Sequence, residues 1–177
     1  MRNTTAAALC SGTLMLGLAL GVAAAAKGNL PGIDAIRGKP AREAAAAALE
    51  TAEKLAGTGT WERIGVARVY YLSGDKSRGQ SIIDAVMSGK TDHNDWQRIG
   101  EVYAAAGEND KAESFFQRAL AAAPKDDTGQ AQIGAWYIRT GRREQGEQLF
   151  SQAFARNPDE VWHYVRAAEA LLNVPPR

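Results

Sequence analysis

Two histidines, and the acids beside one of them, are the side chains best suited to catalysis or metal binding. His93 lies in the run Asp92-His93-Asn94-Asp95, and His163 lies far from it near the end of the chain. Neither belongs to a His-x-x-x-His or Glu-x-x-His pair, the spacings that bring two metal ligands to one helix face. We therefore predict no metal site and interpret Asp92 and Asp95 as helix-start residues that accept bonds from free N–H groups. The alternative, an enzyme or metal-dependent binder, would need Asp92, His93 and Asp95.

Nucleophilic and phosphate-binding chemistry have little support in this sequence. Residues 74–79 (GDKSRG) contain the glycines of a phosphate loop but not its Gly-Lys-Ser/Thr ending, so we predict a turn between helices. No Gly-x-Ser-x-Gly motif occurs, and the one cysteine, Cys10, lies in a segment that we expect to be removed. The sequence thus predicts no catalytic residue, no cofactor and no enzymatic activity.

Length and charge narrow the class of protein. The chain has 177 residues, 45% of them hydrophobic, which suits one ordinary domain with its own core. It carries 21 Lys and Arg against 20 Asp and Glu, and the two signs are interspersed. Because nucleic-acid binding relies on a broad positive field that neutralises phosphates, we predict no nucleic-acid partner.

Residues 1–26 have the three parts of a secretory signal peptide. Arg2 precedes an apolar stretch at 14–22, and the small residues 23–26 end in an Ala-x-Ala site before Lys27. We expect cleavage after Ala26 and a periplasmic or secreted protein that makes no membrane contact. The alternative is an uncleaved anchor of roughly 20 residues, which would make the protein a membrane-tethered adaptor.

The remainder of the sequence repeats itself at a fixed period. Shifting the chain by 34 superimposes Gly100 on Gly134, Tyr103 on Tyr137, Gly107 on Gly141, Phe116 on Phe150, Ala119 on Ala153 and Pro124 on Pro158. The run 96–103 (WQRIGEVY), followed by Ala112, Phe116, Ala119 and Pro124, resembles the tetratricopeptide repeat in pattern and length. The resemblance implies an all-α, right-handed solenoid of about three helix pairs with capping helices at both ends.

Residue types predict the helix pair independently of the family. Apolar residues recur at three- and four-residue spacing in 96–106 and again in 112–120. Gly107 lies between them, where a helix end needs a left-handed residue, and Asn109 or Asp110 is expected to cap the second helix. Pro124 cannot continue a helix. The result is two antiparallel helices joined by a short turn.

The repeats divide the chain into ordered segments. We predict a signal peptide at 1–26, a flexible linker at 27–40, and a repeat domain at 41–173 followed by a tail at 174–177. Within the domain we expect a capping helix at 41–57, repeats at about 60–92, 93–126 and 127–160, and a closing helix at 160–173. The first repeat fits a shift of 33, which aligns Gly74 with Gly107. A shift of 35, suggested by residues 61–65, would place Leu72 at the turn instead.

The resemblance implies that the first helix of each pair lines a concave surface that binds a protein or peptide partner. The side chains expected to face this groove are Trp61, Ile64, Arg68, Tyr71, Gln97, Glu101, Ile138 and Arg139. Burial of Trp61 and Ile64 against the capping helix is an equally weighted alternative. We predict an exported interaction scaffold or assembly factor, whose partner inserts an apolar side chain near Trp61 and Tyr71.

Overall fold

The computed structural model describes residues 32–175. The regular elements of this part of the chain are all helices, and it contains no strand. The predicted signal peptide and the start of the predicted linker lie outside the described residues. The described elements are η1 (Gly32–Ala35), α1 (Ala41–Ala56), α2 (Thr60–Leu72), α3 (Lys76–Met87), α4 (His93–Ala105), α5 (Asn109–Ala122), α6 (Asp127–Arg139), α7 (Arg143–Arg156) and α8 (Val161–Leu171).

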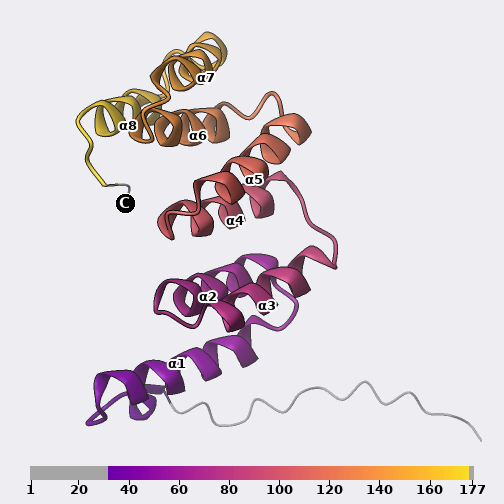
Figure 1. Ribbon diagram of the computed structural model, residues 1–177, viewed down its shortest axis with the longest axis vertical. Coiled ribbons are helices and arrows are strands. Elements are labelled where there is room, and N and C mark those ends of the chain that lie inside the picture. The colour runs from indigo at the N-terminus through magenta and orange to yellow at the C-terminus, as the bar shows by residue number, and fades with distance from the viewer. Residues whose placement is uncertain (1–31, 176–177) are drawn as a thin grey trace, which may run out of the picture. The chain divides into compact units, whose positions relative to one another are not determined.

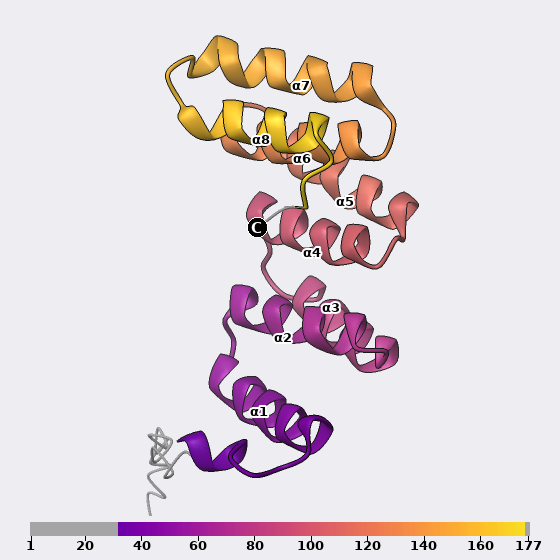
Figure 2. The same ribbon diagram turned by 90° about the vertical axis from the view of Figure 1, so that its left-hand side faces the viewer.

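Consecutive helices pack in pairs, and the pairs follow one another along the chain. Helix α2 packs on α3, α4 on α5 and α6 on α7, while α1 lies against α2 and α8 against both α6 and α7 (Figure 1). Figure 2 shows α2, α4 and α6 in succession on one side, with α8 beside α6. All of the described α-helices belong to one compact unit, Ile33–Arg177. The prediction of an all-α array of three helix pairs, flanked by one helix at each end, is confirmed.

Three glycines end the first helix of each pair. Gly74, Gly107 and Gly141 have φ values of 107°, 75° and 83°, in the left-handed region that glycine adopts most easily. Because Gly74 and Gly107 occupy the same turn in successive pairs, the first repeat follows the shift of 33 and not that of 35. Beyond Gly107, the Glu108 N–H returns to the Tyr103 carbonyl at 2.9 Å and closes the helix end.

Acidic side chains cap α3, α4, α6 and α8, whereas α5 and α7 have no side-chain cap. The Asp92 carboxylate accepts from the N–H groups of Asn94 and Asp95, and the Asp95 carboxylate accepts from the Asp92 N–H, a reciprocal capping box. The helix-start interpretation of this acidic cluster is therefore confirmed. The expectation that Asn109 or Asp110 caps α5 is wrong, because Glu108 is the N-cap residue and its side chain makes no cap hydrogen bond.

Small residues let the two helices of each pair approach closely. A Cβ atom added to Gly146 on α7 would lie 2.5 Å from the Gly134 carbonyl oxygen and 2.5 Å from Ile138 Cγ1, both on α6. In the preceding pair, Phe116 of α5 fills the space beside Gly100 of α4, where a Cβ would lie 2.6 Å from its ring. Each of these pairs is thus held together by close contact at one crossing point.

None of the helices in residues 32–175 combines the length and apolar character needed to cross a bilayer.

We predict opposite effects from adding one methyl group at two helical glycines. Gly65 of α2 is exposed, and an added Cβ would meet no atom within 4 Å, so Gly65→Ala should raise the free energy of unfolding by about 0.5–1 kcal/mol. Gly146→Ala overpacks the α6–α7 crossing and should lower it by about 1–3 kcal/mol. Urea unfolding followed by circular dichroism measures both. Equal stabilisation by the two substitutions would contradict the close crossing.

Candidate binding groove

One groove is lined by the first helices of the pairs and by α8. Its volume is about 720 Å³, and α2, α4, α6 and α8 supply most of its wall. The lining residues are Arg68, Arg98, Glu101, Ala104, Ala105, Phe116, Gln132, Ile133, Ala135, Trp136, Arg139, Arg166 and Glu169. We refer to this set as the groove. Its volume is in the range of pockets that bind small molecules or several residues of a peptide.

The groove combines a positive wall with an apolar floor. Four of its side chains are arginines and two are glutamates, which leaves an excess of two positive charges. Between them lie apolar side chains that include Ala104, Ala135 and Trp136. Planar guanidinium groups bind carboxylates through paired N–H donors. The arrangement therefore suits a ligand that has both a carboxylate and an apolar group.

Arg139 is the groove cation that the fold desolvates most clearly. Partial burial at the end of α6 lowers the pKa of its guanidinium, because the charged form loses hydration there. The neighbouring Arg166 lowers that pKa further, whereas Glu169 raises it. A ligand carboxylate would add a second compensating negative charge beside Arg139 and Arg166.

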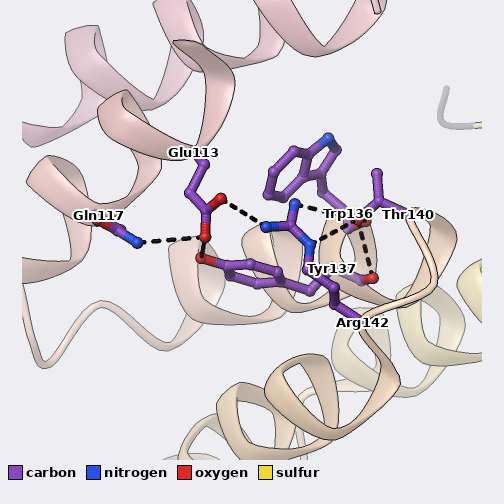
Figure 3. A network of polar contacts seen from close by, with 6 residues as sticks. All are labelled: Glu113, Gln117, Trp136, Tyr137, Thr140 and Arg142. Carbon is purple, nitrogen blue, oxygen red and sulfur yellow. Dashed lines mark hydrogen bonds and ion pairs between the residues drawn. The ribbon is translucent and has the colours of Figure 1, made fainter. Parts of the chain in front are cut away.

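A polar network positions Trp136, part of the groove floor. Figure 3 shows the Glu113 carboxylate between the Tyr137 hydroxyl, which donates to it at 3.2 Å, and the Arg142 guanidinium, which donates at 2.6 Å. The same guanidinium lies over the Trp136 ring, 4.4 Å from its centroid, and donates to the Thr140 hydroxyl. The contacts of one arginine thus link α5 to α6 and fix the orientation of the indole.

Trp61 lies near the groove without forming its wall. Its ring is 53% exposed, and the Arg98 guanidinium stacks on it 3.5 Å from the ring centroid. Because Arg98 also lines the groove, the contact holds this arginine in place. The Trp61 ring is therefore not buried against α1, and it does not line the groove. It is an exposed ring that supports Arg98, which does line the groove.

Ile64 and Tyr71 lie in the core. Each is only 3% exposed, so neither offers surface to a partner. The Tyr71 ring packs edge-on against Tyr103 of the next pair at 5.6 Å, and its hydroxyl donates to Glu108 at 2.9 Å. For Tyr71 the reason is size. The residue lies at the margin of the groove beside the next helix pair, and its side chain is long enough to reach into that interface.

Gln97 and Ile138 are also engaged within the protein. The Gln97 amide is almost buried and donates to Glu101 at 3.2 Å and to Gln132, which joins α4 to α6. Ile138 contacts Gly146 across the α6–α7 crossing. Of the eight predicted groove residues, the structure brings Arg68, Glu101 and Arg139 together in the wall, and their role in binding stays a prediction.

Sequence reasoning did not select several wall and floor residues, namely Arg98, Trp136, Arg166 and Glu169. The repeat period could have found two of them. Adding 34 to Gln132 and Ala135 gives Arg166 and Glu169, so α8 repeats the groove-facing positions of α6. From the sequence we expected this segment only to cover the last pair.

The histidines and acids do not converge on a metal site. Among the described residues, no group of three or more His, Cys, Asp or Glu side chains is placed to hold a metal ion. His93 Nε2 lies 4.0 Å from Asp126 Oδ2, and Nε2 of the buried His163 lies 3.5 Å from Asp127 Oδ2. Each histidine thus faces one carboxylate at the start of α6. Asp92 and Asp95 each use one carboxylate oxygen in the capping box, and the second oxygen of Asp95 is buried without a hydrogen-bond partner.

Comparison with known families agrees with this geometry. Residues 103–172 match the family model described as Tetratricopeptide repeat, a region that covers the end of α4 and all of α5 to α8. The fold is a tetratricopeptide-type helical solenoid, and repeats of this kind generally mediate protein–protein interaction. No curated protein and no solved structure matches the chain.

The contacts of Glu108 with two lysines and with Tyr71 predict a specific loss of stability in acid. Hydrogen bonds from Lys111, Lys76 and Tyr71 lower the pKa of Glu108 to about 2 from 4.5. Because the folded-state pKa is the lower one, the stabilisation is complete above about pH 4.5 and is lost as the pH falls towards about 2. Glu108→Gln should cost about 1 kcal/mol at pH 7 and remove this share of the acid dependence.

Thermal unfolding between pH 2 and pH 7 tests the contribution of Glu108. The control is Glu43→Gln, which changes an exposed glutamate in the first turn of α1. If the two variants lost stability in parallel at every pH, the Glu108 contacts would contribute nothing to folding.

Proposed function

We propose that the protein is an exported interaction scaffold or assembly factor that binds a segment of a partner polypeptide in the groove, without catalysis. The observation that carries this proposal is the wall of four arginines and two glutamates around an apolar floor, built from four helices of a repeat fold. The repeat match supports it, because proteins with this fold generally bind other proteins.

The groove chemistry describes the partner segment. A carboxylate fits near Arg139 and Arg166, where partial burial strengthens an ionic hydrogen bond. A small or apolar side chain fits on the floor at Ala104 and Ala135, beside Trp136. We therefore expect the apolar side chain of the partner at this floor and not near Trp61 and Tyr71, because Tyr71 is buried.

We further propose that the protein acts in the periplasm or outside the cell. The support is the signal-like pattern of residues 1–26 in the sequence. A membrane-tethered adaptor is the alternative if this segment is retained. The two possibilities predict different amino termini for the protein recovered from cells.

Charge reversal in the groove should weaken partner binding without unfolding the protein. Arg68 is exposed and Arg166 is partly exposed, so Arg68→Glu combined with Arg166→Glu should leave the circular dichroism spectrum unchanged. We expect the affinity for the partner to fall by roughly 10- to 100-fold, mainly through lost attraction to a carboxylate. The matched control is Arg42→Glu, which makes the same change on exposed α1.

The partner for this measurement is identified by crosslinking in cells. A photo-reactive amino acid replaces Ala105, an exposed residue of the groove, and the captured protein is then purified and titrated by calorimetry. Unchanged affinity in the double variant would place the binding surface outside the groove. Turnover of a substrate by the purified protein would overturn the non-catalytic part of the proposal.

Export predicts a defined amino terminus. Mass spectrometry of the protein from its native cells should find Lys27 as the first residue and the protein in the extracytoplasmic fraction. An Ala26→Arg substitution should block cleavage, because a long charged side chain does not fit the small-residue site. Recovery of the wild-type chain with residues 1–26 attached to membranes would favour the tethered adaptor.

A further inference from the structure

The outward face of α8 is apolar and largely exposed, although Tyr164 at its edge stacks on Phe154 of α7 with the ring centroids 4.6 Å apart. Val161, Tyr164, Leu171 and Leu172 are 52–75% exposed, and Ala168 between them is exposed as well. In a helix, positions 161, 164, 168, 171 and 172 fall on one face. Terminal repeats of a solenoid usually present a polar outer face, which keeps them soluble. The end of this solenoid, as far as the structure describes it, therefore lacks the usual polar cover.

The repeat register shows what kind of surface this is. Adding 34 to Gly134 and Ile138 of α6, the residues that contact Gly146 of α7, gives Ala168 and Leu172. The exposed face of α8 thus occupies the positions through which α6 binds its partner helix. The Tetratricopeptide repeat match extends to residue 172, so α8 continues the repeat. The face is a helix-pairing surface without a described second helix.

The charges on α8 lie on a different side. Within Val161–Leu171 the only Lys, Arg, Asp or Glu residues are Arg166 and Glu169, and both line the groove. The outward face therefore has no formal charge, and two such faces can meet without bringing like charges together. An uncharged surface also gives a charged partner no complementary group to recognise.

The exposed area is sufficient for a weak, specific contact. Large side chains have areas of about 150–250 Å², so these residues expose on the order of 500 Å² on each copy. Two copies would bury roughly 1,000 Å², near the lower limit for a specific interface. A patch of this size is at the upper end of what a monomer usually exposes.

We propose that α8 pairs with α8 of a second copy of this chain, in an antiparallel, two-fold symmetric contact centred on Ala168. Each helix pair in the solenoid is antiparallel and crosses where small residues meet, as Gly134 and Gly146 do. Two copies of α8 reproduce this crossing with Ala168 against Ala168. The antiparallel arrangement then brings Leu172 of each copy next to Tyr164 of the other.

This dimer leaves both grooves open. Arg166 and Glu169 lie away from the face that contains Ala168 and Leu172, so the contact covers neither groove wall. A dimer would present two grooves, and a partner with two binding segments, or a partner that is itself dimeric, would bind with increased avidity. The inference does not depend on which partner the groove binds.

Sedimentation equilibrium of the purified chain tests the association. We expect a monomer–dimer equilibrium with a Kd of about 1–100 µM, as suits an interface of this size. Leu172→Glu should raise the Kd at least 10-fold while circular dichroism stays unchanged, because Leu172 is 75% exposed. The matched control is Leu55→Glu on α1, where the leucine is 62% exposed, and it should leave the Kd unchanged.

Cysteine crosslinking tests the geometry separately. In a Cys10→Ser background, Ala168→Cys should form a disulfide-linked dimer on mild oxidation, whereas Leu55→Cys should not. A chain that stays monomeric at several hundred micromolar would overturn the proposal and leave this face for another protein. A dimer that Leu172→Glu does not weaken, or that Ala168→Cys does not trap, would equally overturn it.

Discussion

The structure depends on the close crossing of two helices at small residues. At the α6–α7 crossing, Gly134 and Gly146 bring the two backbones so close that one added methyl group would collide. This distance decides how the larger residues pack, since Phe116 can fill the space beside Gly100 only while that glycine has no side chain. A helix of this length is marginal on its own, so the crossing is what makes each pair a stable unit. Stacking the pairs then places their first helices next to one another and forms the groove.

Polar contacts between pairs set the spacing of the groove wall. The Tyr71 hydroxyl donates to Glu108 of the next pair, and the Tyr137 hydroxyl donates back to Glu113 of the previous one. A buried phenol needs a hydrogen-bond partner, so sliding one pair past its neighbour would leave these hydroxyls unsatisfied. Apolar contacts alone would tolerate such sliding. The tyrosine–glutamate contacts therefore select one arrangement of the pairs, and Trp136 is held in the groove floor by the same network.

Repetition made the helices and turns predictable, because glycine at the turn and small residues at the crossing are required in every pair. The position of a side chain within the groove was less predictable. Ala104 lines the floor, whereas Tyr71 and Ile138 in the equivalent positions are turned into the interior. The position lies at the margin between groove and core, so side-chain size decides its environment. Arg68 and Glu101 lie at a more central position, where even a long side chain has only the groove to enter. Their placement in the wall follows from the period alone.

The nearly equal numbers of acidic and basic residues are compatible with an excess of positive charge in the groove. The chain has 21 basic and 20 acidic side chains, which excludes a broad positive field but says nothing about how the charges are distributed. Several acids outside the groove are paired locally: Glu53 with Arg78, Glu108 with Lys76 and Lys111, and Glu113 with Arg142. Since these pairs lie on α1, the second helices and the turns, their charges cancel away from the groove. The groove wall has four arginines and two glutamates, so a nearly neutral protein can attract a carboxylate at one place on its surface.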